Sequence, residues 1–370
     1  MNHTTALHAL HIALGAKMGA FAGYDMPLYY GEGVIKEHEW VRTQCGLFDV
    51  SHMGQLLSEG PQTAKFWETL TPSAFQSKAH GRAQYTVLTN ETGGIIDDLI
   101  ITRLTDDTFF TVINAGCKDK DIAWITSQLS DGLRLTVLDQ QALIALQGPK
   151  AQSVLEQTLK LTLCDMPYMH MIEAHSPCGT PLFISRLGYT GEDGFEISVP
   201  NEKAEMLARL FLDHPSVKPI GLAARDSLRL EMGYPLYGHD IDSETSPIEA
   251  DLAWVMSSSN TGFIGAKGVL GQKNTGPAKK RIGLKLCDKG IAREGAEIRD
   301  GSDRIVGALT SGGFSPTLKE SIGMGYIETA LANIGTSVFV HVRGRNIPAI
   351  LCALPFVPAR TKSMKKKAAA

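Results

Sequence analysis

The sequence has few of the features that mark several large classes of protein. Its 370 residues include only six cysteines, which are scattered without a CxxC pair. This spacing gives neither a zinc finger nor a disulfide framework, and it is typical of a reducing compartment. The 11 histidines show no HExxH or similar ligand spacing, so we predict no metal site. A net charge of −3 provides no basic field for nucleic acid, and no apolar run is long enough to span a membrane.

The two ends of the chain carry no clear targeting signal. The opening stretch "MNHTTALHALHIALGAKMGAFAG" is rich in alanine and leucine, but it has no basic n-region and Lys17 interrupts the apolar residues. We therefore do not expect a signal or transit peptide, and we predict a cytoplasmic protein of bacterial type. The last stretch, residues 359–370, is expected to be a flexible basic tail.

The hydrophobic and charged contents, 43% and 20%, are those of a soluble globular enzyme. A chain of this length predicts two or three domains. Residues 1–270 alternate between hairpins and helices, which indicates α+β layers and not a repeating βα wind. We predict strands at 84–89, 94–104 and 108–115, and helices at 118–129, 150–159, 201–213 and 221–233.

The character of the sequence changes after residue 270. Residues 271–280, "GQKNTGPAKK", are polar with Gly and Pro and are predicted to be a linker. Residues 281–358 consist of short apolar runs between Gly, Asp and Pro turns, which is typical of a small barrel or sandwich.

Two aspartates interrupt the predicted strand "GIIDDLIITRL". Aspartate is a poor strand former because its carboxylate competes for backbone hydrogen bonds. In strict alternation, Asp97 shares a face with Ile95, Leu99 and Ile101, and Asp98 shares the other face with Ile96, Ile100 and Thr102. At least one carboxylate therefore points into apolar surroundings, which suggests a functional role.

The loop "LGYTGEDGFEIS" gathers several polar residues between two predicted strands. Its GxxGxxG spacing is not a dinucleotide fingerprint, because the loop does not open a helix. A tight hairpin explains the glycines. It does not explain the crowding of Tyr189, Glu192, Asp193 and Glu196, so structural and functional roles both stay open.

The helix at 221–233 places Arg225 and Arg229 one turn apart, with Asp226 three residues before Arg229. This spacing fits a surface ion pair and fits equally an arginine fork for an anionic or polar ligand. The adjacent Ser51 and His52 in "LFDVSHMGQL" suggest a hydrolase only weakly. Adjacent strand residues point apart, and the sequence has no GxSxG elbow.

Taken together, Asp98, Glu196 and Arg225 could form a pocket for a ligand rich in hydrogen-bond donors. A pterin ring has an amino group and an adjacent ring N–H that match the two oxygens of a carboxylate. Tyr85, Tyr168, Tyr189 and Tyr234 would supply flat, partly polar walls. Spacing alone does not identify the ligand.

Five motifs, in order along the chain, resemble the aminomethyltransferase (T-protein) family of the glycine cleavage system. They are "GLFDVSHMG", "GGIIDDLI", "GYTGEDGFEI", "GLAARDSLRLE" and "LYGHDI", and the resemblance runs from about residue 6 to residue 357. It implies a folate-binding region built from two interlocked α+β parts, followed by a C-terminal β-barrel.

The resemblance also implies a reaction. The lipoyl arm of H-protein carries an aminomethyl group, whose methylene carbon passes to tetrahydrofolate as co-substrate, with release of ammonia. The chain is expected to act as a monomer that forms a transient complex with lipoylated H-protein. Folate and the lipoyl arm then carry the chemistry, without a metal or a bound redox cofactor.

Site residues follow from the same resemblance, position by position. Asp98 matches the catalytic carboxylate near the reactive folate nitrogens, and Glu196 matches the pterin clamp. Arg360, in "PFVPARTKS", is the C-terminal arginine that best fits a further folate contact. The other positions that match the lining of the folate cavity are Met53, Leu57, Tyr85, Ile100, Asn114, Tyr168, Tyr189, Arg225 and Tyr234.

Three other functions use the same implied fold. A folate-dependent demethylase of a methylated amine or sulfonium would not need H-protein. Dimethylglycine and sarcosine oxidases add an FAD domain, for which this chain has neither room nor fingerprint. A folate-binding iron–sulfur assembly protein carries a KGCxxGQE-type motif where this chain reads "YPLYGHDI".

Overall fold

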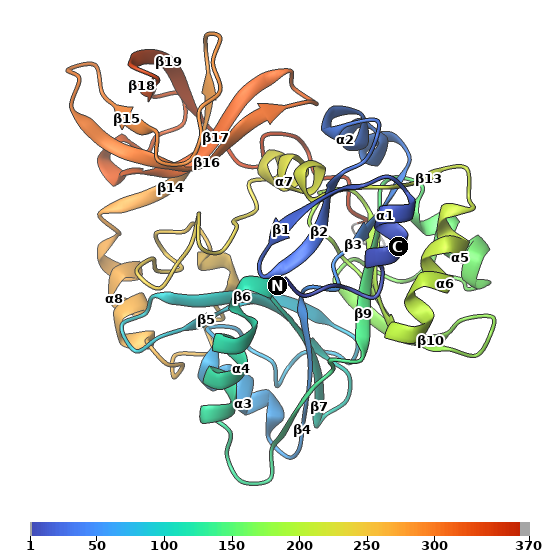
Figure 1. The fold of residues 1–370 in the computed structure, drawn as a ribbon. Helices are drawn as coiled ribbons and strands as arrows, with labels where there is room; N and C mark the ends of the chain where they lie inside the picture. The colour runs from blue at the N-terminus through green and yellow to red at the C-terminus, as the bar shows by residue number, and fades with distance from the viewer. Residues whose placement is uncertain (1, 363–370) are drawn as a thin grey trace, which may run out of the picture.

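The computed structural model describes residues 2–362. Figure 1 shows two sheet regions in the N-terminal part and a third, C-terminal region of strands, with α7 (Leu222–Glu231) between them. Helix α7 packs against α2 (Val34–Thr43), β2 (Tyr24–Tyr29), β16 (Ile305–Ser315) and β17 (Glu320–Glu328). The predicted α+β class is confirmed.

The first sheet has five strands in the order β5-β6-β7-β4-β8. Helices α3 (Thr63–Leu70) and α4 (Lys118–Ser127) cover one face, where Trp67, Leu99 and Ile125 share a buried apolar cluster. The predicted hairpins and the helix at 118–129 are confirmed to within two residues. The strands are β4 (Gly54–Glu59), β5 (Ala83–Thr89), β6 (Ile95–Arg103), β7 (Thr108–Ile113) and β8 (Arg134–Val137).

A β-bulge in β6 changes the predicted alternation of side chains. Leu88 pairs with Asp97, but Thr89 pairs with Ile95, so the register shifts by one residue at Ile96. Asp97 still shares the helix-covered face with Leu99 and Ile101, as expected. The prediction for Ile95 and Ile96 was wrong, because the extra residue exchanges their faces. Ile96 belongs to the Leu99 cluster, and Ile95 packs with Val87 on the other side.

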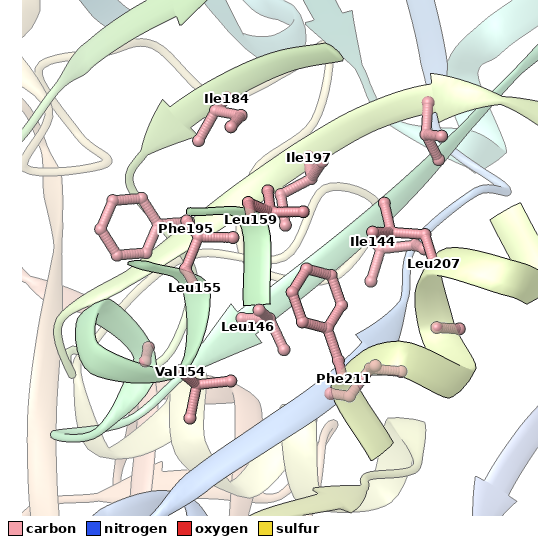
Figure 2. Packing of buried hydrophobic residues seen from close by; sticks show 14 of the residues in the cluster. Ile144, Leu146, Val154, Leu155, Leu159, Ile184, Phe195, Ile197, Leu207 and Phe211 are labelled. Carbon is pink, nitrogen blue, oxygen red and sulfur yellow. The ribbon is translucent and has the colours of Figure 1, made fainter. Parts of the chain in front are cut away.

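The second sheet has six strands in the order β10-β11-β12-β9-β3-β13. Helices α5 (Ala151–Leu159) and α6 (Asn201–Leu212) cover it, and both confirm predicted helices. Figure 2 shows Phe195 and Phe211 in the shared core, with Leu146 between them in this view. The strands are β3 (Cys45–Asp49), β9 (Gln141–Gln147), β10 (His170–His175), β11 (Pro181–Arg186), β12 (Gly194–Pro200) and β13 (Val217–Pro219).

The two sheets are interlocked through the chain itself. Strand β3 lies in the six-stranded sheet, the chain then builds the whole five-stranded sheet, and β9 returns to pair with β3. This arrangement confirms the expected pair of interlocked parts. The N-terminal segment adds α1 (His8–Ala13) and a hairpin of β1 (Lys17–Phe21) and β2, which the sequence patterns did not predict.

The C-terminal strands close into a six-stranded barrel in the order β14-β17-β16-β15-β18-β19, which confirms the predicted barrel. Alternate residues such as Leu284, Ile298 and Val340 fill its interior. The remaining strands are β14 (Lys279–Leu286), β15 (Glu297–Arg299), β18 (Ser337–Val342) and β19 (Arg345–Cys352).

Two expectations about irregular segments need correction. The predicted linker, residues 271–280, is mostly regular structure, because α8 (Ala266–Thr275) occupies its first half and β14 begins at Lys279. The polar residues on the exposed side of α8 have the composition of a linker, which led to the wrong prediction. In the predicted tail, Arg360 forms a bridge with Glu192, so its first residues are held in place; residues 363–370 lie outside the described part of the chain. No helix within residues 2–362 is long and apolar enough to cross a bilayer.

Candidate active site

Asp98 lies on the face of β6 that points away from α3 and α4, and polar neighbours hold its carboxylate. The hydroxyl of Tyr85 donates to Asp98 Oδ2 at 2.8 Å. The side-chain amide of Asn114 donates to Asp98 Oδ1 at 2.8 Å and to the Asp98 carbonyl at 2.9 Å. Three residues predicted from the resemblance therefore meet in one hydrogen-bonded group.

The Asp98 carboxyl is poised to titrate near neutral pH. Burial raises its pKa, the neighbouring Asp97 raises it further, and the bonds from Tyr85 and Asn114 offset part of this, giving a value of about 7. Burial also raises the pKa of Tyr85 well above its usual value. Tyr85 thus stays protonated and is a hydrogen-bond donor to Asp98. A carboxyl with this pKa can exchange a proton with a ligand.

A second group is formed by tyrosines and Arg225. Tyr189 and Tyr234 stack with ring centroids 5.6 Å apart, and the Arg225 guanidinium lies 4.7 Å from the Tyr189 ring centroid. Tyr168 adjoins Tyr234 and, like it, has a pKa raised first by burial. Burial raises the pKa of Tyr189, and the charge of Asp98 raises it further against the opposing charges of Arg229 and Arg225, so Asp98 acts electrostatically on this second group.

Arg225 and Arg229 have separate roles, which their spacing alone did not reveal. Arg229 is 4% exposed and donates to Asp226, to Asp240 and to Ser311 of the barrel. It therefore ties α7 to the barrel. In contrast, Nη1 of Arg225 is buried and has no hydrogen-bond partner within residues 2–362. An unpaired buried donor is costly unless a ligand accepts its hydrogen bond.

Glu196 faces the space between the two sheets. It is 7% exposed, and burial raises its pKa while Arg225 opposes that rise. Glu196 and Ile100 both line a small internal cavity of about 10 Å³, which holds about one water molecule. A pterin ring needs more room, so its binding beside Glu196 requires the lining side chains to move. Met53 and Leu57 pack on the apolar cluster that lines this region.

The other acids of the "GYTGEDG" loop are structural. Glu192 pairs with Arg42 at 2.8 Å and also with Arg360. Asp193 pairs with the fully buried Arg186. Gly191 has φ +76°, and a Cβ there would come within 2.1 Å of Met232 Sδ, so only glycine fits. The hairpin interpretation is correct for these residues, which leaves Tyr189 and Glu196 for a ligand.

Arg360 lies beside this loop, where its guanidinium is already hydrogen-bonded to other residues. Its guanidinium bonds to Glu192 and donates to the Arg42 carbonyl at 3.0 Å. The structure does not bring it to Asp98 or Glu196, and a folate contact from it would require the pair with Glu192 to open.

Two further residues near the site, His52 and Trp254, were not assigned to it from the sequence. Ser51 and His52 lie in the turn between β3 and β4, not in a strand as assumed. The Nδ1 atom of His52 is buried without a hydrogen-bond partner in the described chain. Burial, with smaller effects from Arg225 and Lys118, lowers its pKa to about 4 against the opposing effect of Asp49. Trp254 stacks on Tyr85 at 5.5 Å although it is 64% exposed; nothing in the local sequence indicated this contact.

Comparisons with known proteins agree with this arrangement. The family model described as the GCVT N-terminal domain matches residues 7–260, and the glycine cleavage T-protein C-terminal barrel domain matches residues 279–358. A mitochondrial aminomethyltransferase of Dictyostelium discoideum is 42% identical over 380 residues, covering 97% of this chain and 94% of that protein. An aminomethyltransferase of Chloroherpeton thalassium is 39% identical over 358 residues, covering 95% and 98%.

A solved structure is similar over almost the whole length. The glycine cleavage system aminomethyltransferase T of Bartonella henselae superposes with a TM-score of 0.94 at 40% identity, covering 98% of this chain and all of that one. Both domain models and the full-length relatives lead to one conclusion: the chain belongs to the glycine cleavage T-protein family of aminomethyltransferases.

Proposed function

We propose that this aminomethyltransferase moves the methylene carbon of an aminomethyl group from the lipoyl arm of H-protein to tetrahydrofolate. Two carbon–nitrogen bonds to the folate form, while the carbon–sulfur bond and the bond to the departing nitrogen break. The two folate N–H protons leave with the products, which are 5,10-methylenetetrahydrofolate, ammonia and the reduced lipoyl arm. The observation that carries this proposal is the buried Asp98 carboxylate, held by Tyr85 and Asn114 beside the tyrosine–arginine group.

Asp98 is the proposed catalytic residue. The carbon being transferred lies between sulfur and nitrogen, and its exchange develops positive charge on an iminium-like species. A fixed carboxylate in a site shielded from water stabilises that charge in the transition state. It also holds the folate nitrogen in position for attack. A pKa of about 7 lets the same group accept a proton from that nitrogen.

The remaining site residues are proposed to bind the folate. Glu196 would accept two hydrogen bonds from the pterin edge, and Arg225 would offer its unpaired Nη1 to a polar group of the ligand. Tyr168, Tyr189 and Tyr234 would provide the aromatic walls. Met53, Leu57, Ile100 and Asn114 complete the proposed lining. We leave Arg360 out of the folate site, since Glu192 and Arg42 already engage it.

Ammonia release tests the proposal directly. The protein is mixed with aminomethyl-loaded H-protein and tetrahydrofolate, and ammonia and methylenetetrahydrofolate are measured together. We expect equal amounts of both, dependent on each substrate and unaffected by a metal chelator. A demethylase would act on a free methylated amine or sulfonium without H-protein, which would overturn the proposal.

Partner and location are proposed on the same basis. We propose that the chain acts as a monomer that docks H-protein transiently. The predicted cytoplasmic location stays a prediction, because the relatives include bacterial proteins and proteins named as mitochondrial.

A further inference from the structure

A buried cluster of three side chains lies behind Asp98, on the opposite face of β6. Asp97, Cys117 and Asp121 each present an atom within 4.8 Å of the other two. Asp97 and Asp121 are both 0% exposed. Two carboxyl groups so close together and so far from water cannot both be ionised at low cost.

The hydrogen-bond donors around the two carboxyls are unequally shared. Asp97 accepts from the side-chain amide of Asn114 at 3.0 Å and from the Asn114 backbone N–H at 3.3 Å. Neither oxygen of Asp121 receives a hydrogen bond from an N–H or O–H within residues 2–362. A carboxylate without donors is strongly disfavoured in such a place, whereas a protonated carboxyl can donate to its neighbour. Of the two carboxyls, Asp121 is therefore the one expected to be protonated, and Asp97 the one expected to be ionised.

The groups around Asp121 agree with this assignment. Burial and the negative charge of Asp97 raise the pKa of Asp121 to about 10, with a smaller opposing effect from Lys120 and a rise from Asp98. The ammonium of Lys120 is directed elsewhere, to the Ile96 carbonyl and the Tyr237 hydroxyl. Burial and Asp97 also raise the pKa of Cys117, so its thiol stays protonated.

Asn114 connects this cluster to the proposed catalytic carboxyl. Its amide nitrogen reaches Asp97 Oδ1, Asp98 Oδ1 and the Asp98 carbonyl. An amide has only two N–H hydrogens, so its orientation depends on strong acceptors on both sides. An ionised Asp97 is such an acceptor, and a protonated Asp97 is a weaker one.

We infer that Asp121 is a positioning residue: it donates its proton to Asp97, which keeps Asp97 ionised and Asn114 aimed at Asp98. The effect on turnover rests on the proposed function, but the location of the proton does not. The negative charge of Asp97 in turn keeps Asp98 protonatable near neutral pH.

Two substitutions of Asp121 separate positioning from simple packing. Asp121→Asn keeps an N–H donor toward Asp97, and we expect turnover within about threefold of the parent. Asp121→Leu has a similar size but no donor. Asp97 then loses the donor that favours its ionised form, and we expect kcat to fall about tenfold, which corresponds to the loss of one net hydrogen bond. The acidic limb of the pH–rate profile should move to lower pH, while folate affinity changes little. Equal effects of the two variants, or an unmoved limb in Asp121→Leu, would overturn the inference.

Infrared spectroscopy tests the proton without any substrate. At pH 8.5, a protonated carboxylic acid band is expected in the parent protein and in Asp98→Asn, and it should be absent in Asp121→Asn. Its absence from the parent, or its appearance only after a chelator removes a bound cation, would contradict the inference. A protein that shows the band but releases no ammonia would contradict the proposed function instead.

Discussion

Tyr85 and Asp98 are cross-strand neighbours that share a hydrogen bond of 2.8 Å between the phenol and Oδ2. Tyr85 pairs with Ile100 and Val87 with Asp98 in the β5–β6 register, so the bond runs diagonally across one face of the sheet. The Trp254 ring covers the Tyr85 ring. The carboxyl that we propose to be catalytic is therefore tuned by a donor whose own ring is held by stacking on Trp254.

Tyr85→Phe removes this bond without changing the ring. The bond lowers the pKa of Asp98, so its loss should raise that pKa, and the acidic limb of the kcat profile should move to higher pH. We expect a shift of about one to two units, since one hydrogen bond to a charged group is worth ~1.5–3 kcal/mol and one pKa unit corresponds to about 1.4 kcal/mol. Tyr29→Phe, at a 40% exposed position, is the control. A limb that stays in place in Tyr85→Phe would show that Tyr85 does not tune Asp98.

Asp98→Asn should abolish most of the activity while preserving the fold. It removes the negative charge opposite the developing cation, which typically costs about 10²–10³ in turnover. Folate affinity should change much less, because the charge matters most in the transition state. Ammonia release and folate calorimetry measure the two effects.

The matched variant is Asp97→Asn. Removing this neighbouring charge should lower the pKa of Asp98 and move the acidic limb to lower pH. It also weakens the acceptor that holds Asn114, so turnover at pH 8 should fall as much as in Asp121→Leu but far less than in Asp98→Asn. If Asp97→Asn is the inactive protein and Asp98→Asn works normally, the catalytic carboxylate has been assigned to the wrong residue.

Glu196→Gln should weaken folate binding. It replaces an acceptor by a donor opposite the pterin donors, and the expected loss is ~2–4 kcal/mol, about 30-fold to 1,000-fold in Kd. Glu192→Gln, in the same loop, breaks the pairs with Arg42 and Arg360. It should lower the melting temperature and leave the folate Kd nearly unchanged. The reverse pattern would exchange the roles given to these two glutamates.

Two arginines of α7 give an equally sharp contrast. Arg229→Met leaves Asp240 buried without its partner, which should cost ~3–5 kcal/mol of folding stability. Arg225→Met removes a cation above Tyr189 and should mainly raise the folate Kd. Thermal melts and calorimetry on both variants decide the matter, and a large stability loss in Arg225→Met alone would contradict the assignment.

The raised pKa of Asp98 also predicts a pH-dependent stability difference. The folded protein holds this proton up to about pH 7, whereas the unfolded chain releases it near the ordinary value of 3.8. The contribution of Asp98 to stability therefore falls as the pH rises through this window, by up to about 1.4 kcal/mol per pH unit. Asp98→Asn should melt close to the parent at pH 4 and above it at pH 8. A constant difference across this range would show that the Asp98 pKa is not raised.

Periodicity predicted the long helices and the hairpins well, because each buries one regular apolar face. It could not predict the bulge at Ile96, since the same run of apolar residues is compatible with a regular strand and with a bulged one. Nor could it separate α8 from a linker, because Gly, Lys and Asn on its exposed side resemble loop residues. The N-terminal hairpin of β1 and β2 has mixed burial, so its pattern is weak.

For the site, the resemblance to the family assigned Asp98, Tyr85 and Asn114 to one cavity. In the structure both Tyr85 and Asn114 donate hydrogen bonds to Asp98. Spacing could not reveal which of Arg225 and Arg229 is engaged, because the partners of Arg229, Asp240 and Ser311, lie 11 and 82 residues further along the chain and outside α7. The same holds for Asp121, whose importance depends on its distance from Asp97 and not on any local motif.

The interlocked sheets constrain the order in which the strands can pair while the chain is being synthesised. Strand β3 has neighbours only in β9, about a hundred residues later, and in β13, later still. Closing such long loops is slow, since their entropy must be lost before the pairing repays it. A nascent chain that has reached the end of β8 can complete the five-stranded sheet, but it carries β3 with both edges unpaired. Such edges invite association with other chains. Premature termination before residue 141 should therefore yield aggregation-prone fragments, whereas a chain that includes β9 covers one of these two edges.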